Sequence, residues 1–366
     1  MPKKIPFLDL REQYLSIRDE VTAAIDRVFD RTAFSAGEFV TAFENDFSRY
    51  IRVDHVAGVN SGTSALHLCL LALGIKPGDE VIVPANTFIA TAWAPCYAGA
   101  KPVFADCEPG TWNISPAAIE RKISPRTKAV IGVHLYGQPF NISAVKRLCK
   151  NHGLFLVEDC AQSHGATYEN KVTGVFGDIA AFSFYPGKNL GAYGEAGAVA
   201  SGNAAYIDHI RMLINQGSRK KYCHETIGYN MRMDGVQAAI LSVKLRHLSA
   251  WTARRREIAR MYRDGIKHPA IRMQQTETGA VPAYHLFVIT ADDRDDLMSY
   301  LNGHGIFPGI HYPLPLHLQK AFEPLGYKRG DFPNAEHLSE HCLSLPMYPE
   351  LKNEDVEYII YTLNAY

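Results

Sequence analysis

The chain has 366 residues, of which 47% are hydrophobic and 21% charged, a globular composition with enough apolar material for a large core. The 38 basic residues balance 38 acidic ones, which leaves no electrostatic footprint for nucleic acid or a membrane surface. The seven cysteines never form C-x-x-C, which argues against a disulfide framework or a zinc ribbon. Because no apolar run is long enough to span a bilayer, we expect a cytoplasmic protein with no membrane partner. Because the charge is balanced, we also expect no nucleic-acid partner.

Two helices are predicted first, from apolar residues that repeat at helical spacing over 10–30 and again from Phe39 to Phe47. Short β-rich runs then alternate with helical ones as far as residue 201. The predicted strands are 80–84, 102–106, 129–134, 154–159, 178–184 and 196–201. This alternation predicts an α/β fold, with a mostly parallel sheet covered by helices on both faces and binding residues at the strand ends.

One long helix is predicted over 233–265, and its Arg254-Arg255-Arg256 run is most simply a solvated face. After Gly265 the pattern changes to a strand at 284–289 and a helix at 292–303. We therefore expect a large α/β domain over 10–250 and a small α+β domain over 251–366, which residues 1–10 are candidates to join.

A single lysine, Lys188, stands in a segment that is otherwise poor in charge. A strand-like run leads into it, and glycines and one proline surround it, so the backbone bends and a ligand can approach closely. A lysine held in this way can serve as a nucleophilic amine, for example in a Schiff base. The alternative is an ordinary surface lysine on a loop.

Small and hydroxylated residues at 60–64 precede a predicted helix. Free N–H groups and the positive end of the helix dipole make such a turn a natural phosphate cradle. The alternative is an ordinary Ser/Thr N-cap. Ser183, five residues before Lys188, can add a hydroxyl group to a bound phosphate.

Two carboxylates, Glu158 and Asp159, end a buried strand, where they are costly unless paired. The histidines show no metal-ligand spacing, so we predict no metal site and prefer an organic cation as the partner. The alternative is a capping role. Phe88, at another strand exit, can stack on a flat ring, although core packing is the simpler reading of one phenylalanine. Phosphate cradle, carboxylate, aromatic plate and lysine together are the requirements of a pyridoxal phosphate site.

The linked motifs resemble the DegT/DnrJ/EryC1/StrS family of sugar aminotransferases, within fold type I of the pyridoxal phosphate enzymes. The resemblance covers nearly the whole chain, and Ala196, where glycine is frequent, is a departure from it. The motifs that carry it are residues 60–66, 157–166, 183–197, and 228–234 with 237–239.

The resemblance implies a catalytic pair. Lys188 would hold the cofactor as a Schiff base and move the proton, while Asp159 would pair with the pyridine nitrogen. Gln162 would hydrogen-bond the ring hydroxyl, and Phe88 would stack on the ring. The implied phosphate-binding residues are Gly62, Thr63, Ser183 and, from the neighbouring subunit of a homodimer with shared sites, Asn230. The residues implied to lie near the nucleotide sugar are Arg232, His311 and Tyr312.

The implied reaction is a transamination, because related dehydratases carry histidine in place of Lys188. An amino acid, usually glutamate, would leave its nitrogen as pyridoxamine phosphate, and a keto-sugar on a nucleotide would take it up. Residues 135–139 and 216–224 resemble enzymes that act on the C3 ketone of UDP-3-keto-N-acetylglucosamine, its uronic acid or a dTDP-3-keto-6-deoxyhexose. The alternatives are a C4 aminotransferase on a 4-keto-6-deoxy sugar and a non-catalytic, ligand-sensing regulator. The expected context is amino-sugar biosynthesis for lipopolysaccharide or another cell-surface polysaccharide.

Overall fold

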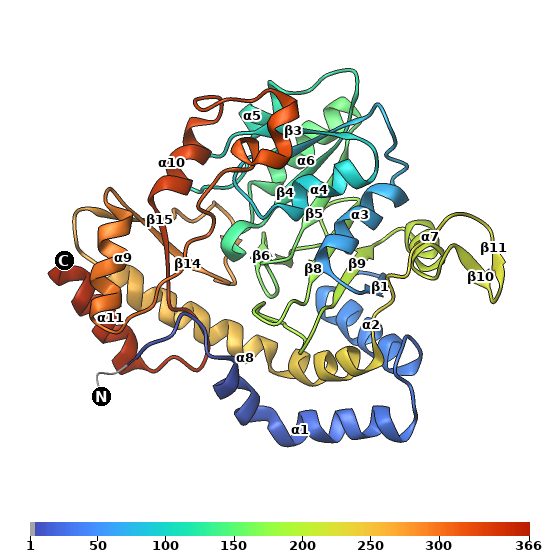
Figure 1. The fold of residues 1–366 in the computed structure, drawn as a ribbon, viewed down its shortest axis with the longest axis horizontal. Coiled ribbons are helices and arrows are strands. Elements are labelled where there is room, and N and C mark those ends of the chain that lie inside the picture. Colours follow the sequence, from blue (N-terminus) through green and yellow to red (C-terminus); the bar gives the residue numbers. More distant parts are fainter. Residues whose placement is uncertain (1–3) are drawn as a thin grey trace.

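The computed structural model describes residues 4–366 and is built around a seven-stranded sheet (Figure 1). The strand order is β1-β9-β8-β5-β4-β2-β3, and five neighbouring strands, from β8 to β3, are parallel. β9 pairs antiparallel with both β8 and β1. The strands are β1 (His55–Val59), β2 (Glu80–Pro84), β3 (Lys101–Ala105), β4 (Thr127–Val133), β5 (Phe155–Asp159), β8 (Ile179–Ser183) and β9 (Gly197–Ser201). The prediction of a mostly parallel sheet is confirmed.

Helices cover both faces of this sheet because successive residues of each strand point to opposite sides. In β2, Val81 and Val83 pack in a core with α3 and α4, whereas Ile82 between them packs in a second core with α5 and α6. Both faces are therefore apolar, as parallel sheets require. These helices are α3 (Gly62–Ala72), α4 (Ala90–Tyr97), α5 (Pro116–Glu120) and α6 (Ile142–His152), and α7 (Ala204–Ile214) joins α3 and α4.

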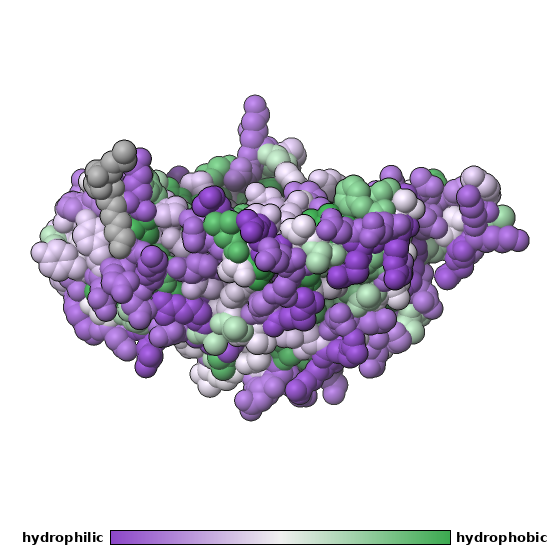
Figure 2. Space-filling model, turned by 90° about the horizontal axis from the view of Figure 1, so that it is seen from below, coloured by the Kyte–Doolittle hydropathy of each residue, from purple (hydrophilic) through white to green (hydrophobic). Residues whose placement is uncertain are grey.

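The predicted long helix is confirmed as α8 (Gly235–Gly265), which packs against α1 (Leu10–Asp30) and α2 (Glu38–Ile51) (Figure 1). Viewed from below, on the side of α1, the surface is mostly hydrophilic with scattered apolar residues (Figure 2). The prediction that Arg255 belongs to a solvated face is wrong. Its side chain is 3% exposed and donates hydrogen bonds to the backbone carbonyls of Tyr284 and Met347, because the C-terminal part of the chain covers this side of α8.

The C-terminal part contributes to several cores. Its antiparallel sheet packs with α9, α11 and the end of α8. Ile5 joins this core and bridges to Ile306, while residues 1–3 lie outside the described part of the chain. The short helices after Pro315 instead pack into the core of the large sheet. The division at residue 250 stays a prediction. The elements are β12 (Ile271–Met273), β14 (Phe287–Ala291), α9 (Arg294–Gly303), the 3-10 helices Leu316–Leu318 and Lys320–Leu325, α10 (Pro333–His341), β15 (Cys342–Leu345) and α11 (Asn353–Ala365).

Two small sheets complete the fold. β6 (Thr167–Tyr168) lies between β7 (Lys171–Val172) and β13 (Ala280–Val281). β10 (Ser218–Lys220) and β11 (Cys223–His224) form a hairpin that projects from the body of the protein (Figure 1). Within residues 4–366, we find no helix with the length and apolar character needed to cross a bilayer.

Candidate active site

A cavity of about 570 Å³ lies at the carboxyl ends of the parallel strands. Asp159 is the last residue of β5, and Ser183 is the last residue of β8. Ligands bind at this edge of an open parallel sheet because the connecting loops are free to diverge there. The predicted site residues that line the cavity are Gly62, Thr63, Phe88, Asp159, Gln162, Ser183, Lys188, His311 and Tyr312.

Lys188 reaches the cavity from a tight turn after β8. The backbone N–H of Lys188 donates to the carbonyl of Tyr185 at 2.9 Å. A side chain at Gly191 would collide with the carbonyl of Pro186, which shows how tight the turn is. Burial lowers the pKa of the Lys188 amine to about 8, and the charge of Asp159 opposes this shift. The amine is thus more easily deprotonated than an ordinary lysine, as a nucleophile must be.

Asp159 is held rigidly, with 4% of its surface exposed. The Thr91 hydroxyl donates to its Oδ2 at 2.9 Å, and the Ala161 N–H donates to its Oδ1 at 3.1 Å. Burial raises the pKa of this carboxyl, while these two hydrogen bonds and the charge of Lys188 act in the opposite direction. A cation placed in the cavity beside Asp159 would stabilise the carboxylate form.

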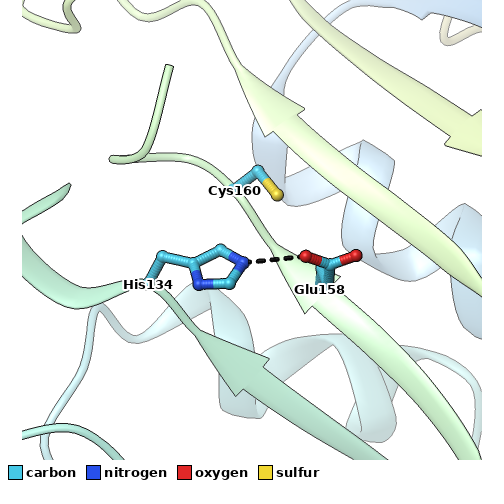
Figure 3. A group of neighbouring side chains, drawn as sticks. All are labelled: His134, Glu158 and Cys160. Carbon is cyan, nitrogen blue, oxygen red and sulfur yellow. Dashed lines mark hydrogen bonds and ion pairs between the residues drawn. The ribbon is translucent and has the colours of Figure 1, made fainter. Parts of the chain in front are cut away.

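Glu158 points away from the cavity, into a buried cluster with His134 and Cys160 (Figure 3). Its carboxylate meets His134 Nε2 at 3.0 Å and accepts the N–H groups of Gly174, Phe176 and Gly177. Burial alone would raise the pKa of Glu158, but these partners outweigh it and lower that pKa. Because four hydrogen bonds already occupy both oxygens, the carboxylate has no position left for a metal ion and serves the structure.

The residues of the predicted phosphate cradle lie where α3 begins. Ser61 is the N-cap and accepts the Ser64 N–H at 3.1 Å, which leaves Gly62 and Thr63 in the first turn, at the positive end of the helix. A Cβ on Gly62 would lie 2.5 Å from Ser183 Cβ, so only glycine lets the helix start approach the Ser183 hydroxyl this closely. Donors and a helix dipole converging on one point fit a phosphate group.

Gln162, Tyr312 and Phe88 follow one another along one wall of the cavity. Gln162 Nε2 donates to the Tyr312 hydroxyl at 3.1 Å, and the rings of Tyr312 and Phe88 are 5.8 Å apart. Phe88 is 50% exposed, so it is not a core residue, and its ring is available to a ligand. An aromatic wall, a fixed carboxylate, a lysine and a phosphate cradle in one cavity fit pyridoxal phosphate.

Phe7, Leu8 and His285 are among the residues that line the cavity and for which we predicted no role. Phe7 and Leu8 come from the N-terminal segment, which carries no periodic pattern or charge that marks a site. His285 precedes β14 in a run that the sequence indicates only as a strand. His311 was predicted, and burial together with Lys188 lowers its pKa to about 4, so its imidazole is neutral at pH 7.

Asn230 and Arg232 are not among the residues that line the cavity. Both lie at the base of the projecting hairpin, where Asn230 is exposed and Arg232 Nη1 donates to Asn215 Oδ1 at 3.1 Å. The structure of one chain therefore separates them from the other predicted residues. Their contribution to the site of a neighbouring subunit stays a prediction.

The chain is similar to known proteins over most of its length. Residues 15–364 match the DegT/DnrJ/EryC1/StrS aminotransferase family. The chain belongs to this family. Among its relatives, "dTDP-3-amino-3,4,6-trideoxy-alpha-D-glucose transaminase" of Streptomyces venezuelae is 44% identical over 95% of this chain and 92% of its own length.

Two further proteins are similar to this chain over nearly its whole length. The "Pleiotropic regulatory protein" of Geobacillus stearothermophilus is 43% identical over 97% of this chain and 96% of its own length. The crystal structure of S. venezuelae DesV in complex with a ketimine intermediate has a TM-score of 0.98 and 43% identity, and covers 100% of this chain and 98% of its own. The predicted fold type is therefore confirmed along the whole chain.

Proposed function

We propose that this protein is a pyridoxal phosphate-dependent aminotransferase that transfers an amino group from an amino acid to a keto group of a nucleotide-linked sugar. The observation that carries the proposal is that Lys188 and Asp159 share one cavity with the phosphate cradle at the start of α3. Membership of the aminotransferase family supports the same conclusion.

Each group of this chain has one task. Gly62, Thr63 and Ser183 would hold the phosphate, and Asp159 would keep the pyridine nitrogen charged. When bound, the cofactor supplies an electron sink next to the carbon that gains or loses a proton. Lys188 would hold the cofactor covalently and, once released from it, would take and return that proton at Nζ. A pKa near 8 suits a base that works close to neutral pH.

The finer substrate proposal is that glutamate is the donor and that the acceptor is the C3 ketone of a dTDP- or UDP-linked sugar. The 3-amino product in the name of the S. venezuelae transaminase supports C3. A C4 aminotransferase is the alternative within the same class. A purely sensing role, which the name of the G. stearothermophilus relative raises, leaves the depressed Lys188 pKa and the Gly62 cradle without a use.

The experiment has two parts. Purified protein loaded with pyridoxal phosphate is mixed with glutamate, and we expect the visible absorbance band to bleach. A separate sample in the pyridoxal form, without glutamate, is incubated with dTDP- and UDP-linked 3-amino and 4-amino sugars. We expect the 3-amino sugars to bleach the band fastest. Faster reaction with 4-amino sugars would replace the C3 proposal by the C4 alternative.

A lysine pair provides the control. Lys188→Ala removes the amine from the cavity, so we expect turnover to fall by at least about 10²-fold, the lower range for losing a general base. Lys146→Ala removes an exposed lysine of α6 and should change nothing. Full transaminase activity in Lys188→Ala would contradict the proposed function.

A further inference from the structure

His285 contacts the residue that follows Lys188. His285 Nδ1 lies 3.3 Å from Asn189 Oδ1, and the Asn189 side-chain amide donates in turn to the carbonyl of Ala283 at 3.0 Å. Asn189 is 3% exposed, and its backbone belongs to the tight turn that carries Lys188. The segment 283–285 is thereby joined to the lysine turn by two adjacent hydrogen bonds.

That segment is itself fixed from two sides. The buried guanidinium of Arg255 donates to the carbonyl of Tyr284 at 3.2 Å, and the Ala283 N–H donates to the carbonyl of Gly137 at 2.9 Å. A Cβ on Gly137 would lie 2.8 Å from the backbone nitrogen of His285, so only glycine lets the two backbones approach this closely. Asn189 therefore connects the Lys188 turn to a rigid support.

The hydrogen bonds also determine the protonation of His285. Asn189 uses its NH₂ group on Ala283, so it offers His285 an acceptor oxygen, and His285 Nδ1 must carry the hydrogen. Burial lowers the pKa of His285 well below its usual value, as do the neighbouring charges. The ionisable groups that face His285 are Lys188, Arg255, His311 and His164, and Asp159 faces Lys188. At pH 7 the ring is neutral, with Nδ1 as donor.

We propose that His285 is a positioning residue that acts on Lys188 through Asn189. The inference rests on the proposed function, since it concerns the lysine that holds the cofactor. Its task is to fix the turn from which Lys188 reaches the cavity. Loss of the contact lets the turn shift and admits water, which favours the charged form of the amine.

Two substitutions distinguish the roles of the two ring nitrogens of His285. The amide of asparagine can place an N–H near the position of Nδ1, whereas glutamine places its amide near the position of Nε2. In holoenzyme, the titration of the lysine–cofactor absorbance band with pH reports the environment of Lys188 independently of turnover. We expect His285→Asn to leave the midpoint of this pH titration close to that of the wild type. We expect His285→Gln to raise it by at least about 0.5 pH unit and to lower kcat by about 10- to 100-fold, with a smaller change in KM.

Asn189→Ala breaks the same connection from the other side, so it should reproduce the His285→Gln shift. The double variant should add little, because contacting residues in one path are not additive. His304→Gln, which changes an exposed histidine of the C-terminal part, is the control and should leave the midpoint unchanged. Asn189→Ala also supplies the test if His285→Gln does not fold.

Three results would overturn the inference. The first is an unchanged midpoint in both His285→Gln and Asn189→Ala. The second is a normal midpoint in His285→Gln together with a shifted one in His285→Asn. The third is additive shifts in the double variant. The second result would place the function of the ring at Nε2, in the cavity. Absence of any cofactor band from the wild-type protein would instead overturn the proposed function, so the two failures are distinguishable.

Discussion

Phe7 stacks on His311, with ring centroids 5.3 Å apart and an angle of 24° between the ring planes. The segment that carries Phe7 is fixed at both ends. Ile5 exchanges backbone hydrogen bonds with the strand-like segment around Ile306, and Asp9 caps α1 by accepting two N–H groups. His311 Nδ1 also meets Ser344 Oγ at 2.9 Å, so its ring is held on two sides. The first described residues therefore build one wall of the cavity.

Phe7→Ala should impair use of the nucleotide sugar more than it impairs folding. An aromatic contact of this kind is worth about 0.5–1.5 kcal/mol beyond its buried area, so we expect kcat/KM to fall by about 2- to 13-fold. Steady-state kinetics with varied concentrations of the nucleotide sugar measure this kcat/KM. Phe29→Ala, which removes an exposed ring that contacts Phe34, is the control. Equal kinetics for the two variants would show that Phe7 has no part in the site.

Gly62→Ala should weaken cofactor binding. The added methyl group would lie 2.5 Å from Ser183 Cβ, so the start of α3 must move away from Ser183. Overpacking of this kind costs about 1–3 kcal/mol, which predicts a rise of roughly 5- to 150-fold in the Kd for pyridoxal phosphate. Fluorescence titration of cofactor-free protein measures the Kd. Gly202→Ala has open space around the new methyl group and should bind normally. An unchanged Kd in Gly62→Ala would place the phosphate elsewhere.

The stability of cofactor-free protein should depend on pH through Lys188. Its pKa is about 8 in the folded chain and 10.5 in an ordinary lysine, so the unfolded chain binds more protons between these values. The free energy of unfolding therefore gains a contribution that rises as pH increases from about 8 to 10.5 and is constant below that window. Lys188→Met lacks this contribution.

Urea denaturation of both proteins across this range checks the pH prediction. The unfolding free energy of Lys188→Met is subtracted from that of the wild type, because the subtraction cancels the titration of groups that the two proteins share. This difference should increase with pH. A constant difference for Lys188→Met would mean that Lys188 keeps an ordinary pKa.

Subunit mixing tests the predicted homodimer with shared sites. If Asn230 serves the cavity of its partner, mixing Lys188→Ala with Asn230→Ala forms one intact site in each mixed dimer. Random exchange should then restore about a quarter of wild-type activity. A mixture of Lys188→Ala with Asp159→Asn should restore none, because both residues line the same cavity. Exchange demonstrated with tagged subunits, without any recovery, would contradict sharing through Asn230.

The parallel sheet could be predicted from the sequence, and so could the meeting of most candidate site residues at one edge of it. Apolar runs bounded by glycine, proline and polar residues predict buried strands, and residues that follow parallel strands must meet at one edge of the sheet. Lys188, Asp159 and Ser183 could be predicted because each lies at or near such a strand end. The Gly62 cradle could be predicted because helix N-termini have a local signature.

Which of the two carboxylates faces the cavity could not be predicted from the sequence. Glu158 and Asp159 are adjacent in β5, so they point to opposite faces, but both faces are buried, and hydrophobic alternation cannot tell them apart. Phe7, His285 and Arg255 owe their positions to contacts with residues far along the chain. Local patterns carry no information about such contacts, because packing of the whole chain selects the partner.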